Sequence, residues 1–289
     1  MVSILICLEE IRPTLDAFPA ALLRLESGGE ELWVDIREEK RGVNHINPIF
    51  QGSDGLVLPL TRPRAPVTLI EDLPTFPNPD LEEMVKVRAE ISAEGDARIE
   101  FQMPLRGAQA DRLLERVESV PVDQEEMLYR QLAVSLFAGA SAVEGNIEPS
   151  PDGAVIDLEM LVRNACDAEE GELVCRSLVL ARPLVPILAS LPERTYPLVL
   201  RVPIKRRLEL ELVPAPGWEP THRAPRRLEA EWGSVGEDLE KGAGSLRSVL
   251  HIALPAQTVA TEDYAAFARF CQAVDELSTR PPRLKRLAE

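Results

Sequence analysis

Cysteine and histidine are the residue types of this chain that could carry out nucleophilic chemistry. Thiol catalysis needs a thiolate, a base that takes its proton, and an acid that orients the base. The candidates are Cys7, Cys166, Cys175, Cys271, His45, His222 and His251. No CxxC, HExxH, GxSxG or Gly-rich phosphate loop occurs among the 289 residues. We therefore expect no metal site and no cofactor.

The stretch from Phe18 to Ile36 is where a site could form. Two apolar runs, residues 20–25 and 32–36, flank Ser27-Gly28-Gly29-Glu30. A Gly-Gly pair accepts the positive φ values of a tight turn, so this pattern predicts a β-hairpin. Asp35 would then lie at the end of the second strand.

This hairpin resembles the last part of a papain-like transglutaminase core. In that family one strand presents a histidine and the next ends in Trp-x-Asp, and the two side chains complete a Cys-His-Asp triad. Trp33-Val34-Asp35 fits the second strand, but Ala20 occupies the histidine position, two residues after Phe18. The resemblance places the nucleophilic cysteine upstream, and we expect the chain to begin after it. It implies that Asp35 is a vestigial triad acid.

The resemblance extends along the chain, most clearly over residues 83–278. In bacterial transglutaminase-like proteins, paired strands, a glycine, a helical stretch and further strands follow the core. An Arg-x-x-Pro-Leu stretch then leads into the last β-rich domain, and the sequence from Arg194 to Leu198 matches it. The family ends on a Tyr-x-x-Phe-x-x-Phe helix, which Tyr264, Phe267 and Phe270 reproduce. The chain thus resembles the C-terminal part of such a protein.

Composition limits the classes of partner. The chain carries 32 Lys and Arg against 48 Asp and Glu, a net charge of −16. An acidic surface repels phosphate backbones, which argues against nucleic-acid binding. No apolar run is long enough to span a membrane. The sequence does not decide the compartment. We expect a cytoplasmic protein from the chain as given, and a periplasmic or envelope protein if an N-terminal segment is missing.

The patterns predict an α+β fold made mainly of antiparallel sheet. We expect a core remnant over residues 1–72, a Pro-rich linker over 73–82, and a domain of β-ribbon, helices and strands over 83–190. A β-rich domain with a packed terminal helix would follow over 191–280, and a loose tail over 281–289. Helices are predicted over 108–119, 121–137 and 261–277.

Several side chains could bind rather than catalyse. Arg201, Lys205, Arg206 and Arg207 form the densest basic run. This run could dock an acidic partner, or its members could protect a sheet edge from pairing with other chains. Cys166 and Cys175 could face each other across a hairpin, but we expect two free thiols, since free cysteine is a common core residue. His45 is expected in a polar loop and His251 on the outer face of a strand. His222 precedes the basic residues Arg223, Arg226 and Arg227, and we expect it on a solvated face rather than in a small anion-binding patch.

Three hypotheses of function follow. The first is a non-catalytic module that binds a protein or peptide along an exposed sheet edge. The second is a fragment of a transglutaminase-like or cysteine-peptidase-like enzyme, with its nucleophile in an upstream or separate segment. The third is a structural envelope protein, which an oxidised Cys166–Cys175 pair would favour. Ala20 at the histidine position favours the first.

Overall fold

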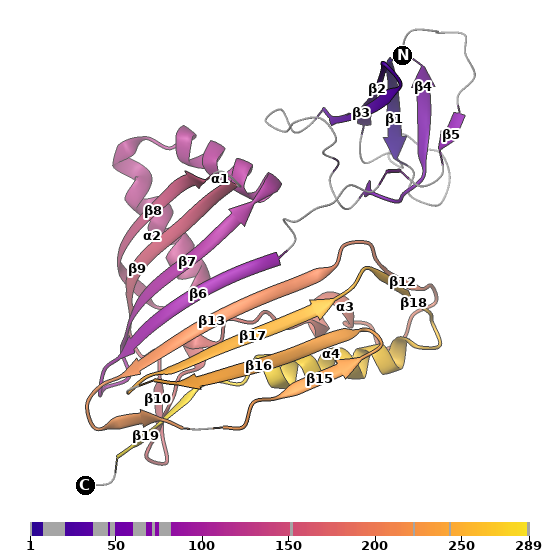
Figure 1. Cartoon of the computed structure of the whole chain (residues 1–289). Helices are drawn as coiled ribbons and strands as arrows, with labels where there is room; N and C mark the ends of the chain where they lie inside the picture. The colour runs from indigo at the N-terminus through magenta and orange to yellow at the C-terminus, as the bar shows by residue number, and fades with distance from the viewer. Residues whose placement is uncertain are drawn as a thin grey trace. The chain divides into compact units, whose positions relative to one another are not determined.

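The computed structural model of the chain has two compact units, Met1–Pro79 and Asp80–Glu289 (Figure 1). The structure describes residues 2–7, 21–36, 46, 50–59, 68–70, 73–74, 82–150, 153–221, 223–242 and 244–287. The division falls after Pro79, within the Pro-rich segment over residues 73–82. Each unit is described by itself.

The first unit contains a five-stranded antiparallel sheet in the order β3-β2-β1-β4-β5. Its strands are β1 (Val2–Cys7), β2 (Ala21–Ser27), β3 (Glu30–Asp35), β4 (Gly55–Pro59) and β5 (Thr68–Ile70). The predicted hairpin is present as β2 and β3, and Gly28 and Gly29 have φ values of 61° and 86°. Positive φ at both central residues is what a tight hairpin turn demands. Leu22 and Trp33 are buried on the two strands.

The second unit is built on an eight-stranded sheet in the order β15-β16-β17-β13-β6-β7-β9-β8. Its strands are β6 (Glu82–Ile91), β7 (Ala97–Arg106), β8 (Ala140–Ser150), β9 (Gly153–Val162), β13 (Ile204–Pro214), β15 (Arg227–Ala230), β16 (Gly233–Lys241) and β17 (Leu246–Leu254). Neighbours are antiparallel except β13 and β6, which run parallel. The fold is therefore strand-rich and mostly antiparallel.

One face of this sheet is apolar and covered, and the other is polar. Residues alternate along each strand, so that Val85, Val87 and Ala89 are buried while Lys86 and Arg88 lie on the opposite face. The covering elements are α1 (Gly107–Ser119), the short helical turn η4 (Val122–Gln124), α2 (Glu125–Leu136), the turn η5 (Arg176–Leu178), α3 (Val185–Leu188) and α4 (Tyr264–Ser278). In Figure 1, α4 lies behind the strands β15 to β17.

The predicted helices form, because their apolar stripes pack on this sheet. On α4, Tyr264, Phe267 and Phe270 are buried, as the 3.6-residue spacing predicts. Phe267 and Phe270 lie 6.1 and 5.9 Å from the Trp232 ring, measured between ring centroids. On the other half of the sheet, the Phe101 ring meets the Phe137 ring edge to face at 6.0 Å.

Two smaller sheets complete the unit and change the predicted domain scheme. One has the order β10-β11-β19-β14, with β10 (Asp167–Glu169), β11 (Glu172–Val174), β14 (Trp218–Pro220) and β19 (Arg283–Arg286). The other pairs β12 (Leu198–Leu200) with β18 (Gln257–Val259). Residues 283–286 are thus a central strand rather than part of a loose tail.

Strands from both sides of the expected boundary at residue 190 share the large sheet. Ten residue pairs join β6 to β13, from Lys205 with Glu82 to Pro214 with Ile91. A parallel pairing between strands more than 100 residues apart leaves no local signal, which explains why periodicity alone suggested two domains. Among the described residues, no helix is both long and apolar enough to cross a bilayer.

Candidate functional site

Asp35 is the last residue of β3 and lies opposite Leu22 of β2. Only 3% of its surface is exposed. Two residues earlier, the Trp33 ring lies below the Arg24 guanidinium, 5.7 Å from the guanidinium carbon to the ring centroid. Ala20, His45 and His222 lie outside the described residues. The role of Asp35 as a vestigial triad acid therefore remains a prediction.

The four members of the predicted basic run do not form one patch. Lys205 and Arg207 alternate with Arg206 along β13, so Arg206 points to the opposite face of the sheet. Arg206 Nε lies 2.9 Å from Glu83 Oε2, and its Nη1 donates to the carbonyl of Arg182 at 2.8 Å. Arg206 thus bonds to other residues of the same chain.

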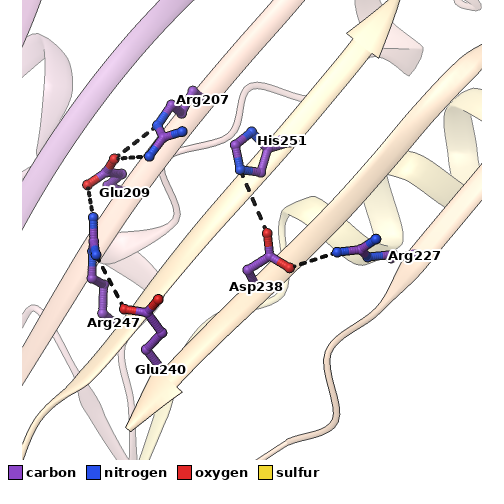
Figure 2. Close-up of polar contacts among 7 residues, drawn as sticks. All are labelled: Arg207, Glu209, Arg227, Asp238, Glu240, Arg247 and His251. Carbon is purple, nitrogen blue, oxygen red and sulfur yellow. Dashed lines mark hydrogen bonds and ion pairs between the residues drawn. The ribbon is translucent and has the colours of Figure 1, made fainter. Parts of the chain in front are cut away.

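Arg207 is also neutralised internally, on the polar face of the sheet. Its Nε and Nη2 donate to Glu209 Oε1 at 3.0 and 2.7 Å. Glu209 in turn accepts from Arg247 Nη2 at 2.9 Å, and Arg247 Nη1 donates to Glu240 at 3.3 Å (Figure 2). The hydrogen bonds from Arg247 and Arg207 hold the pKa of Glu209 below its ordinary value, against the opposing effect of burial.

A second small network lies beside it on β15, β16 and β17. Asp238 accepts from Arg227 Nη2 at 3.0 Å, and its other oxygen lies 3.9 Å from His251 Nε2 (Figure 2). His251 is on the outer face of β17 with 43% of its side chain exposed, as predicted. The arginines and the histidine of these two networks therefore lie within hydrogen-bond or ion-pair distance of carboxylates on the same face.

Arg201 and Lys205 differ from their neighbours in the basic run. Both are exposed, and neither forms an ion pair with any described residue. Arg201 directly follows β12, and Lys205 is near the start of β13. Of the four predicted binding residues, these two remain available to a partner.

Cys166 and Cys175 form a disulfide bond across the β10–β11 hairpin. The expectation of two free thiols is therefore wrong. The hairpin begins directly after Cys166 and ends directly before Cys175, so its strand pairing brings the two residues together. Cys271, on α4, is free and fully buried, and burial raises its pKa to about 12, so it is no nucleophile.

Exposed apolar side chains are concentrated in the stretch of sequence from α3 to β12. Of the eight large apolar residues that are strongly exposed in the described part of the chain, four lie between residues 187 and 199. They are Ile187, Leu191, Tyr196 and Val199, with exposures of 58, 50, 75 and 53%. The sequence marked Tyr196 only through the Arg-x-x-Pro-Leu match, and its exposure could not be read from the pattern.

This segment is held on the first turn of α4. The Tyr264 hydroxyl donates to the carbonyl of Leu191 at 3.0 Å, and the Arg194 guanidinium carbon lies 5.5 Å from the centroid of the Tyr264 ring. Asp275 further along α4 accepts from the backbone N–H groups of Leu184 and Val185 at 2.6 and 2.9 Å. The exposed side chains thus project from an anchored backbone.

Comparisons with known proteins leave the family undetermined. No protein-family model matches the chain, and no curated protein matches it. A crystal structure of a protein from Parabacteroides distasonis, described as a "putative protease", is similar with a TM-score of 0.47 and 14% identity. The match covers 98% of this chain and 40% of that protein. No cluster of metal-ligating side chains occurs among the described residues.

Proposed function

We propose that this chain is a non-catalytic module that binds a protein or peptide partner through the segment 187–205. The observation that carries the proposal is the concentration of exposed Ile187, Leu191, Tyr196 and Val199 in this short stretch. Contiguous apolar exposure on a soluble surface is characteristic of interaction sites. Tyr196 is the expected anchor, since tyrosine is enriched among the residues that dominate binding energy.

The edge of a small sheet supports binding of an extended chain. Among the described strands, β12 pairs only with β18, so its other edge has no strand partner. An extended peptide can add to such an edge through main-chain hydrogen bonds, while alternate side chains contact the surface. Val199, at the centre of β12, would contact the side chain directly opposite it on the added strand.

The charges near this edge favour an acidic partner. Arg201 directly follows β12 and Lys205 is the second residue of β13, and neither has an ion-pair partner among the described residues. Because the chain as a whole carries −16, these cations would orient an acidic segment at one place rather than over the whole surface. The proposed ligand is therefore an extended peptide with apolar residues at alternate positions and acidic residues between them.

A displayed library of random peptides tests this proposal. Peptides selected on the purified chain should be enriched in apolar and acidic residues, and their dissociation constants should be measured by fluorescence anisotropy. Tyr196→Ala should weaken binding by a factor of about 30, as expected for an anchor residue. Val134→Ser is the matched control, because Val134 on α2 is 51% exposed and distant in the sequence. Peptides that respond to the control but not to Tyr196→Ala would disprove the proposal.

The burial of Asp35 at the end of β3 supports an alternative, an enzyme fragment whose nucleophile lies in another segment. The assay is amine incorporation or peptide hydrolysis by the purified chain. We expect no turnover. Turnover that Asp35→Asn abolishes, while Asp54→Asn in the exposed position before β4 leaves it intact, would establish the alternative.

A further inference from the structure

A cavity lies between the apolar face of the large sheet and the elements that cover it near the C-terminal end of α4. Its floor consists of buried leucines of β13 and β17, which are Leu208, Leu210, Leu212, Leu246 and Leu250. Residues from the stretches 178–181 and 277–283 form the opposite wall. None of the residues 187–205 lines the cavity, so it is separate from the proposed partner surface.

The lining of this cavity extends from the buried floor to the protein surface. Leu239, Leu277 and Pro281 in the lining are half-buried, and Arg280 and Arg283 are exposed. The cavity therefore has a mouth beside the end of α4. A ligand that enters there would direct its apolar part towards the leucines and keep its polar part near the arginines.

The charged side chains of the lining are mostly basic. Three arginines and one glutamate line the cavity, a balance of 3 − 1 = +2, in a chain with a net charge of −16. Arg223 is bonded to the buried Glu237, and Arg283 Nη1 lies 2.9 Å from Glu172 Oε2. Arg280 forms no ion pair with any described residue. The mouth thus offers one cation to an anionic ligand, while Arg223 compensates the charge of Glu237.

The volume of the cavity limits how much hydrocarbon can enter. It is about 90 Å³, whereas a cavity of about 150 Å³ binds the six carbons of benzene. In proportion, the space holds about four carbon atoms and is too small for an aromatic ring. A charged group on the same molecule would remain at the mouth.

We propose that this cavity binds the aliphatic part of a short carboxylate with three or four carbons beyond the carboxyl group. The carboxylate accepts hydrogen bonds from the guanidinium of Arg280 at the mouth. The hydrocarbon leaves water for a wall of leucines, and the charge stays near solvent, where little of its hydration is lost. Free short-chain acids such as 3-methylbutanoate have this chemistry, and so does the last residue of a peptide that ends in valine or leucine.

Titration of the full chain with 3-methylbutanoate tests the site, with the methyl resonances of ¹³C-labelled leucine as the readout. The ligand should shift the signals of Leu210 and Leu250, which line the cavity, and leave those of Leu113 on α1 unchanged. Each buried carbon should tighten binding about fourfold, so acetate, with three carbons fewer, should bind about 60-fold more weakly. Benzoate should also bind more weakly, because its ring exceeds the space. Unshifted signals of Leu210 and Leu250, or tighter binding of benzoate, would overturn the proposal.

Arg280→Gln tests the contact with the carboxylate. This variant should weaken binding of 3-methylbutanoate about two- to fivefold and leave binding of the neutral 3-methylbutanamide unchanged. Arg112→Gln, at an exposed position on α1, is the matched control and should change neither. The proposal is wrong if Arg280→Gln leaves the dissociation constant of the acid unchanged, or if it weakens acid and amide equally.

Ala181→Leu tests the cavity itself. Ala181 is buried in the wall, and leucine adds three carbons, close to the hydrocarbon that the ligand would supply. Binding of 3-methylbutanoate should fall at least tenfold, while unshifted Leu113 signals show that the variant is folded. Wild-type affinity in the folded variant would contradict the proposal.

N-acetyl-leucine distinguishes the two sources of the ligand, because it joins the same four-carbon side chain to a carboxylate and a peptide-like amide. Tighter binding than that of 3-methylbutanoate supports a peptide C-terminus as the ligand. Weaker binding supports a free short-chain acid.

Discussion

Removal of the Cys166–Cys175 bond should destabilise the second unit by an amount that follows from the loop it closes. The two cysteines are nine residues apart in the sequence. In the chain-entropy description, a loop of about nine residues restricts the unfolded chain by about 8.7 cal/mol/K, or about 2.6 kcal/mol at 25 °C. The double variant Cys166→Ala/Cys175→Ala should therefore lose about 2–4 kcal/mol, the larger value including the small void left in the core.

Urea unfolding of the oxidised chain, with and without reductant, measures this loss. With a slope of about 2–3 kcal/mol per molar urea, a loss of about 2.6 kcal/mol lowers the midpoint by about 1 M. The double variant provides the control, because reductant should leave its midpoint unchanged. Thiol titration in denaturant should also find two fewer thiols in the oxidised chain than in the reduced chain.

The reasoning fails if reduction leaves the midpoint within about 0.2 M of the oxidised value, or if both samples titrate the same number of thiols. The first result would mean that the strand pairing of β10 with β11, together with the ion pairs of Arg176 to Asp167 and Glu169, already restricts this loop in the unfolded chain. The second would mean that the two residues are free thiols, as expected for cysteines buried in a core.

Three further outcomes are expected. Glu209→Gln should lower the free energy of unfolding by about 1–2 kcal/mol at pH 7, because two arginines lose a charged acceptor. Since the folded-state pKa of Glu209 is lowered, the difference in unfolding free energy between the variant and the wild type should shrink as the pH falls below the ordinary value of 4.5. A difference that grows in acid would contradict this. Cys271 should resist iodoacetamide at pH 8 in the native chain and react after unfolding, because its pKa of about 12 and its burial suppress the thiolate; rapid native labelling would refute the packing of α4. Asp275→Asn should lower the free energy of unfolding in urea by about 1–3 kcal/mol, since one of the two backbone N–H groups at the start of α3 would lose its acceptor. Glu276→Gln, at the next and exposed position, is the control and should leave the free energy of unfolding unchanged.

Local elements could be predicted from the sequence where one physical rule dominates. The Gly28-Gly29 turn needs positive φ and has it, and Glu94-Gly95-Asp96 turns β6 into β7 with a φ of 91° at Gly95. The aromatic stripe of α4 is buried because its spacing matches the helical period. In each case the signal lies within a few residues of the structure it specifies.

Features that depend on distant partners could not be predicted. β19 is a strand because β11 and β14 flank it, and nothing within Arg283–Arg286 reveals those neighbours. The basic run read as one patch, yet strand alternation sends Arg206 to one face and Arg207 to the other. A cavity under the large sheet was missed for the same reason: Glu237 of β16 and Ser278 of α4 both line it, but they belong to separate elements that only the fold brings to one cavity.

The pairing of charges on the polar sheet face decides where a partner can bind. The chain carries 32 basic residues, but four arginines of this face, Arg88, Arg207, Arg227 and Arg247, are bonded to neighbouring carboxylates. Breaking such a pair to form another gains little, because exposed ion pairs differ by less than about 1 kcal/mol. Arg201 and Lys205 have no ion pair with any described residue that a partner would need to break, and in the sequence they follow the apolar segment with Tyr196. A partner that uses charge and apolar contact together therefore has its best surface at the edge of β12.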